Sequence, residues 1–494
     1  MSPAPISRRR ALGLAGLGVA SIAAGTAGWL ATAQNPGGPF HAGASGEALR
    51  EPQILDARAG RLAVALTAAA GARLAGRDTS ALGYNGTSPG PTLRVRPGDD
   101  LAVRVTNRLD QPTNLHTHDL QISPLGNSDN PFLRIDPGAS FDYLFRIPPD
   151  HPAGTHWYHP HHHGTVADQV FGGLAGALLV DRGPELPVTA DRVLVVTDTT
   201  LDADGRIAAA GPMDRMMGRQ GELVLVNGQH QPTIAASTGS MERWRIINGC
   251  TSRVLALRLP GQPLAQVALD GAFLPAPAST DRLVLAPGNR TDLLIRPDTA
   301  GRFQLTTDGY DRGSTAGMTG MGRRGQTATS PASTLATLTV DGPPRQPPPL
   351  PASLPAPTPN TAPITTRRRI TFAMGMGTGG GMGPGGMGFT IDGRTFDPRR
   401  DDQTVQFGRT EEWTITNLSP LAHPFHLHVW PFTVVADSIG TPPTGTHQGV
   451  VLVPAQGWVR LRIPFTANPG RSVYHCHILD HEDAGMMSTI NVRA

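Results

Sequence analysis

GDDLAVRVTN at 98–107, GSMERWRIIN at 239–248 and GRTEEWTITN at 408–417 are three copies of one pattern. Each copy begins with a glycine, largely alternates apolar and polar residues, and ends in an asparagine nine residues after the glycine. Alternation with a period of two predicts a β-strand that buries one face, and the glycine marks a turn before it. Each copy also follows a pair that favours a tight turn: Asn85-Gly86, Asn227-Gly228 or Asp392-Gly393.

A second element recurs after each copy in the same order. The pairs Pro137-Gly138, Pro287-Gly288 and Gln456-Gly457 each lead to a further glycine, at Gly154, Gly301 and Gly470. Such order is typical of an internal repeat, and short strands between turn signals are typical of β-sandwiches. We therefore predict an all-β protein with three consecutive β-sandwich domains, at about 48–183, 184–342 and 364–494. The proline-dense residues 343–363 predict a stiff linker.

The composition agrees with this fold class and excludes others. Glycine and proline account for 59 and 47 of the 494 residues, too many for a helical protein because both interrupt helices. The two cysteines are too few for a disulfide-stapled scaffold or an all-cysteine metal site.

The first 33 residues predict an export signal. Ser7-Arg-Arg-Arg10 precedes an apolar run at 11–30 and a small-residue cleavage site, Ala31-Thr-Ala33. This order is typical of a secretory signal, and the paired arginines indicate the twin-arginine route of bacteria. We expect the Tat export machinery as a partner, a periplasmic or extracellular location, and no stable membrane insertion after cleavage. An uncleaved membrane anchor is the alternative.

The charge balance excludes one class of partner. Removing 1–33 takes away three of the 42 basic residues and no acid, which leaves 39 basic against 39 acidic side chains. A net charge of zero does not indicate nucleic-acid binding.

Histidines occupy equivalent places in the first and third copies only. After the repeated asparagine come His116-Thr-His118 in the first copy and His423-Pro-Phe-His426-Leu-His428 in the third. Five residues after the later glycine come His159-Pro-His161 and His475-Cys-His477. The second copy has no histidine pair in either place.

These histidines predict a site for several metal ions. Residues two apart in a strand face the same side, which gives four same-face pairs: His116/His118, His159/His161, His426/His428 and His475/His477. Imidazole is a good ligand for copper, zinc or iron, and eight imidazoles exceed what one ion can bind. We expect the site between the first and third domains. Surface histidines or a zinc store are the alternatives.

Cys476 lies between two of these histidines, so its sulfur should point to the opposite face of the strand. His481 and Met486 follow it by five and ten residues, and His423 belongs to the other histidine motif. One thiolate, two imidazoles and a thioether form the donor set of a blue copper site. A buried free cysteine is the alternative. This arrangement indicates one-electron oxidation of a reductant, transfer through Cys476, and reduction of a multi-electron acceptor, with O2 the obvious candidate.

Together the motifs resemble those of bacterial three-domain multicopper oxidases of the laccase and cuprous-oxidase kind, over about residues 48–494. The most specific is His-Cys-His-x3-His-x4-Met at 475–486. The resemblance implies three cupredoxin-like Greek-key sandwiches, the second without copper ligands, and four copper ions per chain. It implies a type 1 copper on His423, Cys476, His481 and Met486, and a type 2 copper on His116 and His426. It implies a type 3 pair on His118, His159, His161, His428, His475 and His477.

One position departs from the family pattern. The first motif usually reads His-x-His-Gly, whereas Asp119 follows His118 here, which leaves the shape of this loop and the role of the carboxylate open. Reduction of O2 to water consumes protons, and the family places acids beside the first motif and after the cysteine motif. Glu482 and Asp129 match these positions, with Asp119 as the rival of Asp129. We predict catalytic roles for Cys476, Glu482 and Asp129. Loop capping is the alternative role for each acid.

Methionine-rich segments bear on the reductant. We expect them to be loops: one with Met213, Met216 and Met217, one with Met374, Met376, Met382 and Met387, and a Gly-rich stretch with Met318 and Met321. Thioethers prefer Cu(I), and copper-tolerance members of the family carry similar segments. We expect Cu(I) as the favoured reductant, with phenols and aromatic amines as laccase-type donors. Drift in low-complexity loops is the alternative.

Two other functions are open at this stage. One is a copper-type nitrite reductase, against which the fourth histidine pair and the third domain speak. The other is a non-enzymatic copper-binding or cell-division protein on the same scaffold, which would have lost ligands. We expect a monomer, and the sequence does not choose among Cu(I), Fe(II), Mn(II) and organic reductants.

Overall fold

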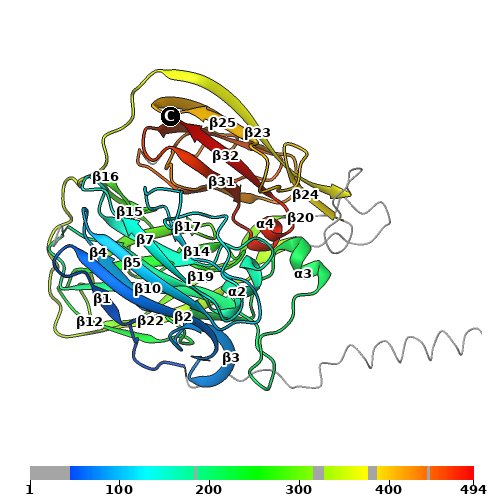
Figure 1. Ribbon diagram of the computed structural model, residues 1–494. Coiled ribbons are helices and arrows are strands. Elements are labelled where there is room, and N and C mark those ends of the chain that lie inside the picture. Colours follow the sequence, from blue (N-terminus) through cyan, green and yellow to red (C-terminus); the bar gives the residue numbers. More distant parts are fainter. Residues whose placement is uncertain (1–44, 183–185, 315–326, 377–386, 442–444) are drawn as a thin grey trace, which may run out of the picture.

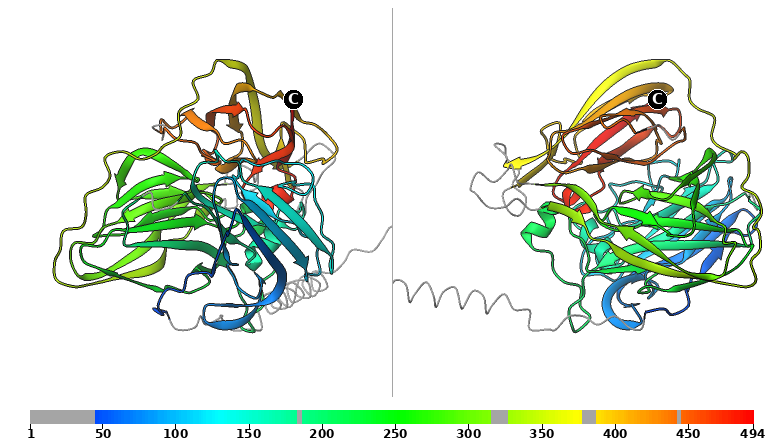
Figure 2. Two further views of the ribbon diagram at one scale, coloured as in Figure 1. Left: turned by 60° about the vertical axis from the view of Figure 1, so that its left-hand side comes forward. Right: turned by 180° about the vertical axis from the view of Figure 1, so that it is seen from behind.

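A computed structural model describes residues 45–182, 186–314, 327–376, 387–441 and 445–494 (Figure 1). Strands dominate it, with three short helices: α2 (Val166–Gly172), α3 (Pro212–Met217) and α4 (Leu479–Asp483). The strands form three β-sandwiches, and the third lies across the junction of the first two (Figure 2). The predicted all-β, cupredoxin-like fold is confirmed.

The first sandwich packs a four-stranded sheet on a five-stranded one. The first sheet has the order β3-β2-β5-β7, with β2 (Arg61–Leu74), β3 (Arg77–Tyr84), β5 (Asp100–Asn107) and β7 (Ser140–Arg146). The second has the order β1-β4-β9-β8-β6, with β1 (Ile54–Asp56), β4 (Thr92–Val95), β6 (His116–His118), β8 (Gly154–His159) and β9 (Gly176–Val180). Leu101 and Val103 of β5 share one buried cluster with Leu178 of β9, so the alternation seen in the first repeat copy joins the two sheets.

The second sandwich has the same arrangement with two added strands. One sheet has the order β11-β10-β13-β18-β15-β16, with β10 (Ala190–Thr199), β11 (Leu223–Val226), β13 (Glu242–Asn248), β15 (Leu264–Leu269), β16 (Ala272–Thr280) and β18 (Arg290–Ile295). The other has the order β12-β22-β19-β14-β17, with β12 (Thr233–Ser237), β14 (Leu255–Arg258), β17 (Leu283–Leu285), β19 (Gly301–Asp308) and β22 (Ser333–Asp341). A separate hairpin joins β20 (Tyr310–Ser314) and β21 (Thr327–Ser330).

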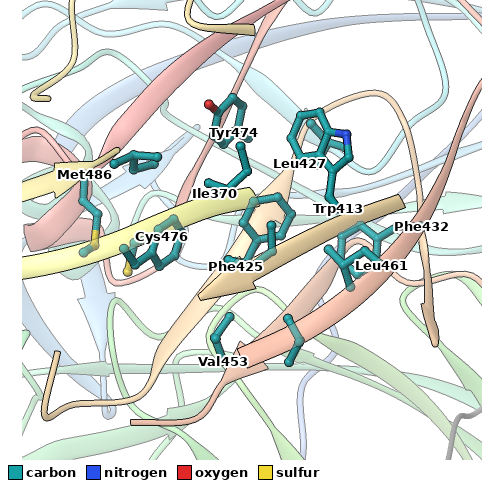
Figure 3. Packing of buried hydrophobic residues seen from close by; sticks show 14 of the residues in the cluster. Ile370, Trp413, Phe425, Leu427, Phe432, Val453, Leu461, Tyr474, Cys476 and Met486 are labelled. Atoms are coloured by element: carbon teal, nitrogen blue, oxygen red, sulfur yellow. The ribbon is translucent and has the colours of Figure 1, made fainter. Parts of the chain in front are cut away.

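The third sandwich again has two sheets. One has the order β24-β23-β26-β30-β28, with β23 (Ile364–Met376), β24 (Met387–Ile391), β26 (Arg409–Asn417), β28 (Thr433–Asp437) and β30 (Trp458–Phe465). The other has the order β25-β32-β31-β27-β29, with β25 (Gln403–Gln406), β27 (His423–Leu427), β29 (Val450–Val453), β31 (Gly470–Cys476) and β32 (Met487–Arg493). Trp413, Phe425 and Leu461 fill the space between the sheets (Figure 3). Burial of each such side chain stabilises the fold by about 1.5–3 kcal/mol.

The three repeat copies form equivalent strands, β5, β13 and β26. Each pairs in parallel with a preceding strand (β2, β10 or β23) and antiparallel with a following one (β7, β18 or β30). The later glycines Gly154, Gly301 and Gly470 begin β8, β19 and β31, which are equivalent in the opposite sheets. The internal repeat read from the sequence is therefore a repeat of sheet topology.

The repeated asparagine closes each strand with the same hydrogen bonds. The Asn417 amide donates to the carbonyls of Leu421 (2.7 Å) and Pro454 (2.9 Å), and its oxygen accepts from the Ser419 N–H (2.9 Å). Asn107 and Asn248 hold their own loops in the same way, and all three side chains are fully buried. In the outer sandwiches this loop leads directly into a histidine strand, so the asparagine sets where that strand begins.

The proline-rich segment is docked on the second sandwich. Residues 342–363, all described, form no strand between β22 and β23. Leu350 and Leu354 pack against a buried cluster of the second sandwich, and the Leu354 N–H donates to the Pro275 carbonyl (3.0 Å). The predicted domain limits stay a prediction.

Within the described part of the chain, no helix combines the length and apolar character that crossing a membrane requires. The export signal predicted at 1–33 lies outside the described residues.

We expect Asn417→Ala to cost about 1–3 kcal/mol of unfolding free energy, because buried carbonyls lose their donor. Urea unfolding measures this loss, and hydrogen–deuterium exchange should show faster exchange at 418–422. Asn248→Ala is the matched control: it should cost a similar amount and leave exchange at 418–422 unchanged. Unaltered stability in Asn417→Ala would contradict this role.

Candidate metal centre

Paired strands bring the histidine motifs together within each outer sandwich. β6 and β8 are antiparallel neighbours, with His116 opposite His159. β27 and β31 are paired in the same way, with His426 opposite His475. The equivalent strands of the second sandwich, β14 and β19, contain no histidine along their described lengths.

The two outer sandwiches then bring their histidines face to face. The rings of His116 and His428 stack with centroids 3.9 Å apart and planes 15° apart. The rings of His118 and His426 stack with the same centroid distance and an angle of 11°. All eight histidines of the four pairs are 2 % exposed or less. The structure thus gathers imidazoles from both ends of the chain into one buried cluster.

The ligand atoms of this cluster fall into three all-histidine groups, each with its ligand atoms within 4.8 Å of one another, and Asp119 forms a further such group with His118 and His426. The groups are His118, His159 and His477; His161, His428 and His475; and His116, His426 and His428. The first two groups together are the six histidines expected for a type 3 pair. The third contains the two expected for a type 2 site, with His428 as an additional neighbour.

The free nitrogens of these rings fit metal ions. The Nε2 atoms of His116, His118, His159 and His426 are buried and have no hydrogen-bond partner. The opposite nitrogens are held: His159 Nδ1 lies 2.8 Å from the Pro160 carbonyl and His426 Nδ1 lies 2.7 Å from the Gly449 carbonyl. Burial lowers the pKa of His159 to about 3, so its imidazole is neutral at pH 7 and its lone pair is available. Ligating histidines in proteins are usually anchored through the second nitrogen in this way.

A second group of donors lies on the other side of β31. His423 Nδ1 is 3.3 Å from Cys476 Sγ and 3.3 Å from His481 Nδ1. Met486 lies beside Cys476 in the same buried cluster, and the Met486 carbonyl accepts from the Cys476 N–H (3.0 Å) (Figure 3). Burial raises the pKa of the Cys476 thiol, so its ionisation needs a nearby cation such as a bound metal ion.

The outer nitrogens of both histidines in this second group are anchored. His423 Nε2 lies 2.6 Å from Ser419 Oγ, and the His481 Nε2–H donates to the Met216 carbonyl (3.0 Å). Both Nδ1 atoms therefore face the sulfur, which is the arrangement that a His2Cys site requires.

Acidic residues on either side of His481 and Glu482 fix α4 to the other sandwiches. Asp480 pairs with Arg219 of the second sandwich (2.6 Å). Asp483 accepts from the N–H groups of Gly164 (2.6 Å) and Ala167 (2.8 Å) in the first. The two functional candidates on α4 are thus held in place from both neighbours.

The predicted proton-relay acids contact different histidines. Glu482 Oε2 lies 3.1 Å from His475 Nδ1, and its Oε1 lies 3.4 Å from His161 Nε2. Asp129 Oδ1 lies 2.9 Å from His116 Nδ1 and accepts from the Thr117 N–H (2.9 Å). Burial raises the pKa of Asp129 to about 7, so this carboxyl can take up and release a proton near neutral pH.

Asp119 does not face solvent. It is buried, has a backbone φ of +65°, and lies 3.2 Å from His118 Nδ1 and 2.6 Å from the Arg290 guanidinium. The positive φ explains why glycine is usual at this position of the family motif. Sequence reasoning missed Arg290 and its partner Asp270, because they come from the sandwich without a histidine pair. The repeated Pro287-Gly288 pair was the only signal near them.

The methionines that the structure describes in these segments lie in a helix and in strands, not in the loops that the sequence predicted. Met213, Met216 and Met217 lie in helix α3, which starts at Pro212 and has Asp214 accepting from the Gly211 N–H (2.8 Å). Met374 lies in β23 and is buried, because it continues the inward alternation of Ile370 and Phe372. Met376 is the last residue of β23 and Met387 is the first residue of β24. Met318, Met321 and Met382 lie outside the described residues.

Comparison with known proteins agrees with this donor set. Multicopper oxidase family models match residues 66–185, 153–323 and 361–494. The chain belongs to the multicopper oxidase family and is a copper-dependent oxidoreductase.

Individual relatives cover most of the chain. It is 29% identical to the multicopper oxidase mco of Staphylococcus aureus over 84% of this chain and 85% of that one. It is 31% identical to the cell division protein FtsP of Pectobacterium atrosepticum over 83% and 85%. A solved multicopper oxidase from Campylobacter jejuni, described as a metallo-oxidase, has a TM-score of 0.80 at 29% identity, covering 93% of this chain and 98% of that one.

Proposed function

We propose that the protein couples one-electron oxidation of Cu(I) to reduction of O2 to water. The balanced reaction takes four Cu(I), one O2 and four protons to four Cu(II) and two waters. Copper ions bound in the two sites would supply reversible one-electron chemistry, and four of them match the four electrons that O2 needs. The observation that carries the proposal is the segment 475–477, whose thiolate faces one donor group while its two imidazoles face the other.

The residues of the second group of donors would be the type 1 ligands, His423, Cys476, His481 and Met486. The eight paired histidines would hold a type 2 ion and a type 3 pair, with His116 and His426 on the type 2 ion. Cys476 gives the shortest covalent route between the sites, since His475 and His477 are its direct neighbours in the chain.

Two buried carboxyl groups, each in contact with different histidines of the cluster, support proton delivery. Glu482 contacts His161 and His475, and Asp129 contacts His116. Both are 2 % exposed or less, so bulk water does not reach them freely and a proton has to pass through the groups themselves.

Helix α3 supports a metal ion as the reductant. Its Met216 carbonyl accepts from His481, and Phe389 stacks on the His481 ring with centroids 4.3 Å apart. His481 is therefore fully buried, and a bulky phenol cannot touch its ring directly. Met213 is 45 % exposed and Met216 is half-buried, so the helix that contacts His481 through its backbone also carries thioethers that solvent can reach. Soft thioether donors select Cu(I).

The alternatives lack this support. A copper-type nitrite reductase would not need eight clustered imidazoles. A non-enzymatic copper-binding or cell-division protein on the same scaffold would not need every donor of both sites. It would also not need buried acids beside those donors. Export by the twin-arginine route, a periplasmic or extracellular location and a monomeric state stay predictions.

We expect Glu482→Gln to keep the blue absorbance of the protein and to lower the rate of O2 reduction at least tenfold, because the amide cannot pass on a proton. The loss should be steepest toward neutral pH, where protons are scarce. Stopped-flow reoxidation of the reduced protein between acidic and neutral pH measures this. The same rate as in the unaltered protein across that range would remove Glu482 from the relay.

We expect the double variant Met213→Leu, Met216→Leu to lower kcat/KM for Cu(I) about tenfold and to leave phenol oxidation nearly unchanged. Leucine keeps the apolar volume and removes the soft donor, and the Met216 carbonyl still accepts from His481. O2 uptake with Cu(I), Fe(II), Mn(II) and a phenol, compared side by side, measures this.

The matched control for this pair is Met374→Leu, a substitution in the core of the third sandwich that should leave all four rates unchanged. Equal losses with Cu(I) and phenol in the double variant would exclude α3 as a Cu(I) site. No uptake with any donor in the copper-loaded protein would overturn the proposed function itself.

A further inference from the structure

The second sandwich supplies no imidazole to the cluster, yet one of its side chains reaches into it. Arg290 begins β18 and is fully buried. Its Nη2 lies 2.6 Å from Asp119 Oδ2 in the first sandwich, and its Nη1 lies 3.2 Å from Asp270 Oδ1 in the second. A guanidinium therefore lies between two buried carboxylates at the junction of the sandwiches.

The Asp119 end of this chain contacts the cluster directly. Asp119 Oδ2 is 3.2 Å from His118 Nδ1, and Asp119 Oδ1 is 3.7 Å from His426 Nδ1. These are the nitrogens that face away from the unpartnered Nε2 atoms of the same rings. Arg290 Nη1 also lies 3.4 Å from His118 Nδ1, so both ends of the Asp119–Arg290 pair contact this nitrogen. Groups on the outer nitrogen of a ligating histidine orient its ring.

The backbone around Asp119 is shaped to hold it. A Cβ at Gly449 would lie only 1.9–2.0 Å from atoms of the Asp119 carboxyl group, so Gly449 makes room for this side chain. The loop of the third sandwich therefore accommodates a carboxylate at a place where the usual motif has none.

The Asp270 end anchors that loop. Asp270 Oδ2 accepts from the N–H groups of Gly449 (3.1 Å) and Val450 (3.0 Å), and the Gly449 carbonyl lies 2.7 Å from His426 Nδ1. The Asn289 amide donates to Asp270 (2.8 Å) and to the Val450 carbonyl (3.1 Å). One buried chain of contacts thus joins all three sandwiches and ends on His118 at one side and on His426 at the other.

Two carboxyl groups and one guanidinium meet in this chain, so Arg290 by itself can neutralise only one ionised carboxyl group. Metal ions held by His118 and His426 would be a second source of positive charge beside Asp119.

We propose that Asp119, Arg290 and Asp270 are positioning residues of the histidine cluster, through which the sandwich without copper ligands fixes His118 and His426. The proposal rests on the proposed function for the identity of the metal. It assigns to the second sandwich a direct part in building the metal centre.

Asp119→Gly tests this, because glycine takes a φ of +65° without strain and removes only the carboxylate. In the copper-loaded full chain we expect the type 2 signal in electron paramagnetic resonance to be altered, and copper to be lost from the cluster at chelator concentrations at least tenfold lower. The blue absorbance of the type 1 site should be unchanged, which shows that the third sandwich is folded.

Asp292→Asn is the matched control. Asp292 is a buried carboxylate of β18 that pairs with Arg243 (3.0 Å) and joins the first and second sandwiches through the Thr155 hydroxyl (2.7 Å). This variant should lower the melting temperature and leave copper retention and the type 2 signal unchanged. Equal copper loss in both variants would overturn the proposal, because any broken ion pair would then have the same effect.

The double variant Asp119→Gly, Arg290→Gln separates positioning from simple neutralisation of Arg290. We expect the type 2 signal to stay altered, as in Asp119→Gly, and the melting temperature to fall further, because Arg290 still pairs with Asp270 in the single variant and Asp270 loses that partner here. Recovery of the normal signal would overturn the positioning role. These readouts depend on copper binding alone, so a protein that retains copper but does not consume O2 would refute the proposed function and leave this inference standing.

Discussion

The alternation of side chains along β31 is the constraint on which the rest of the structure depends. Neighbouring residues of a strand point to opposite faces, so Cys476 cannot face the same side as His475 and His477. Its thiolate joins His423 and His481, while its neighbours join six other imidazoles and close the larger cluster. Cys476 and its two neighbours therefore place the two sites on opposite faces of one segment, and the backbone of that segment connects them.

The remainder of the fold fixes the position of the segment 475–477 and of its partner histidines. The eight paired histidines come from the first and third sandwiches, so residues that are far apart in the sequence meet in the cluster. His161 and His475 are 314 residues apart in the chain, and their Nε2 atoms lie 3.1 Å from each other. The buried asparagines at the ends of β5 and β26 fix the loops that lead into the histidine strands. Asp480 and Asp483 of α4 fix the position of the third sandwich on the other two. The second sandwich keeps the repeat topology but gives charged side chains in place of imidazoles.

Much of this could be predicted from the sequence because it depends on local periodicity. The Gly-to-Asn spacing of the three copies gave the equivalent strands, and the His-x-His spacing placed ligand pairs on single strand faces. The surroundings of Asp119 could not be predicted, since Arg290 and Gly449 are distant in sequence and carry no motif of their own. The loop prediction for Met374 is wrong, because the glycines around this residue obscure the strand alternation that buries it. The export signal and the domain limits stay predictions.

The most direct test of the account is anomalous diffraction at the copper absorption edge from crystals of the copper-loaded protein. The account predicts four copper peaks per chain, one beside Cys476 and three among the eight paired histidines. A single peak, or fewer than three peaks among the eight paired histidines, would contradict it.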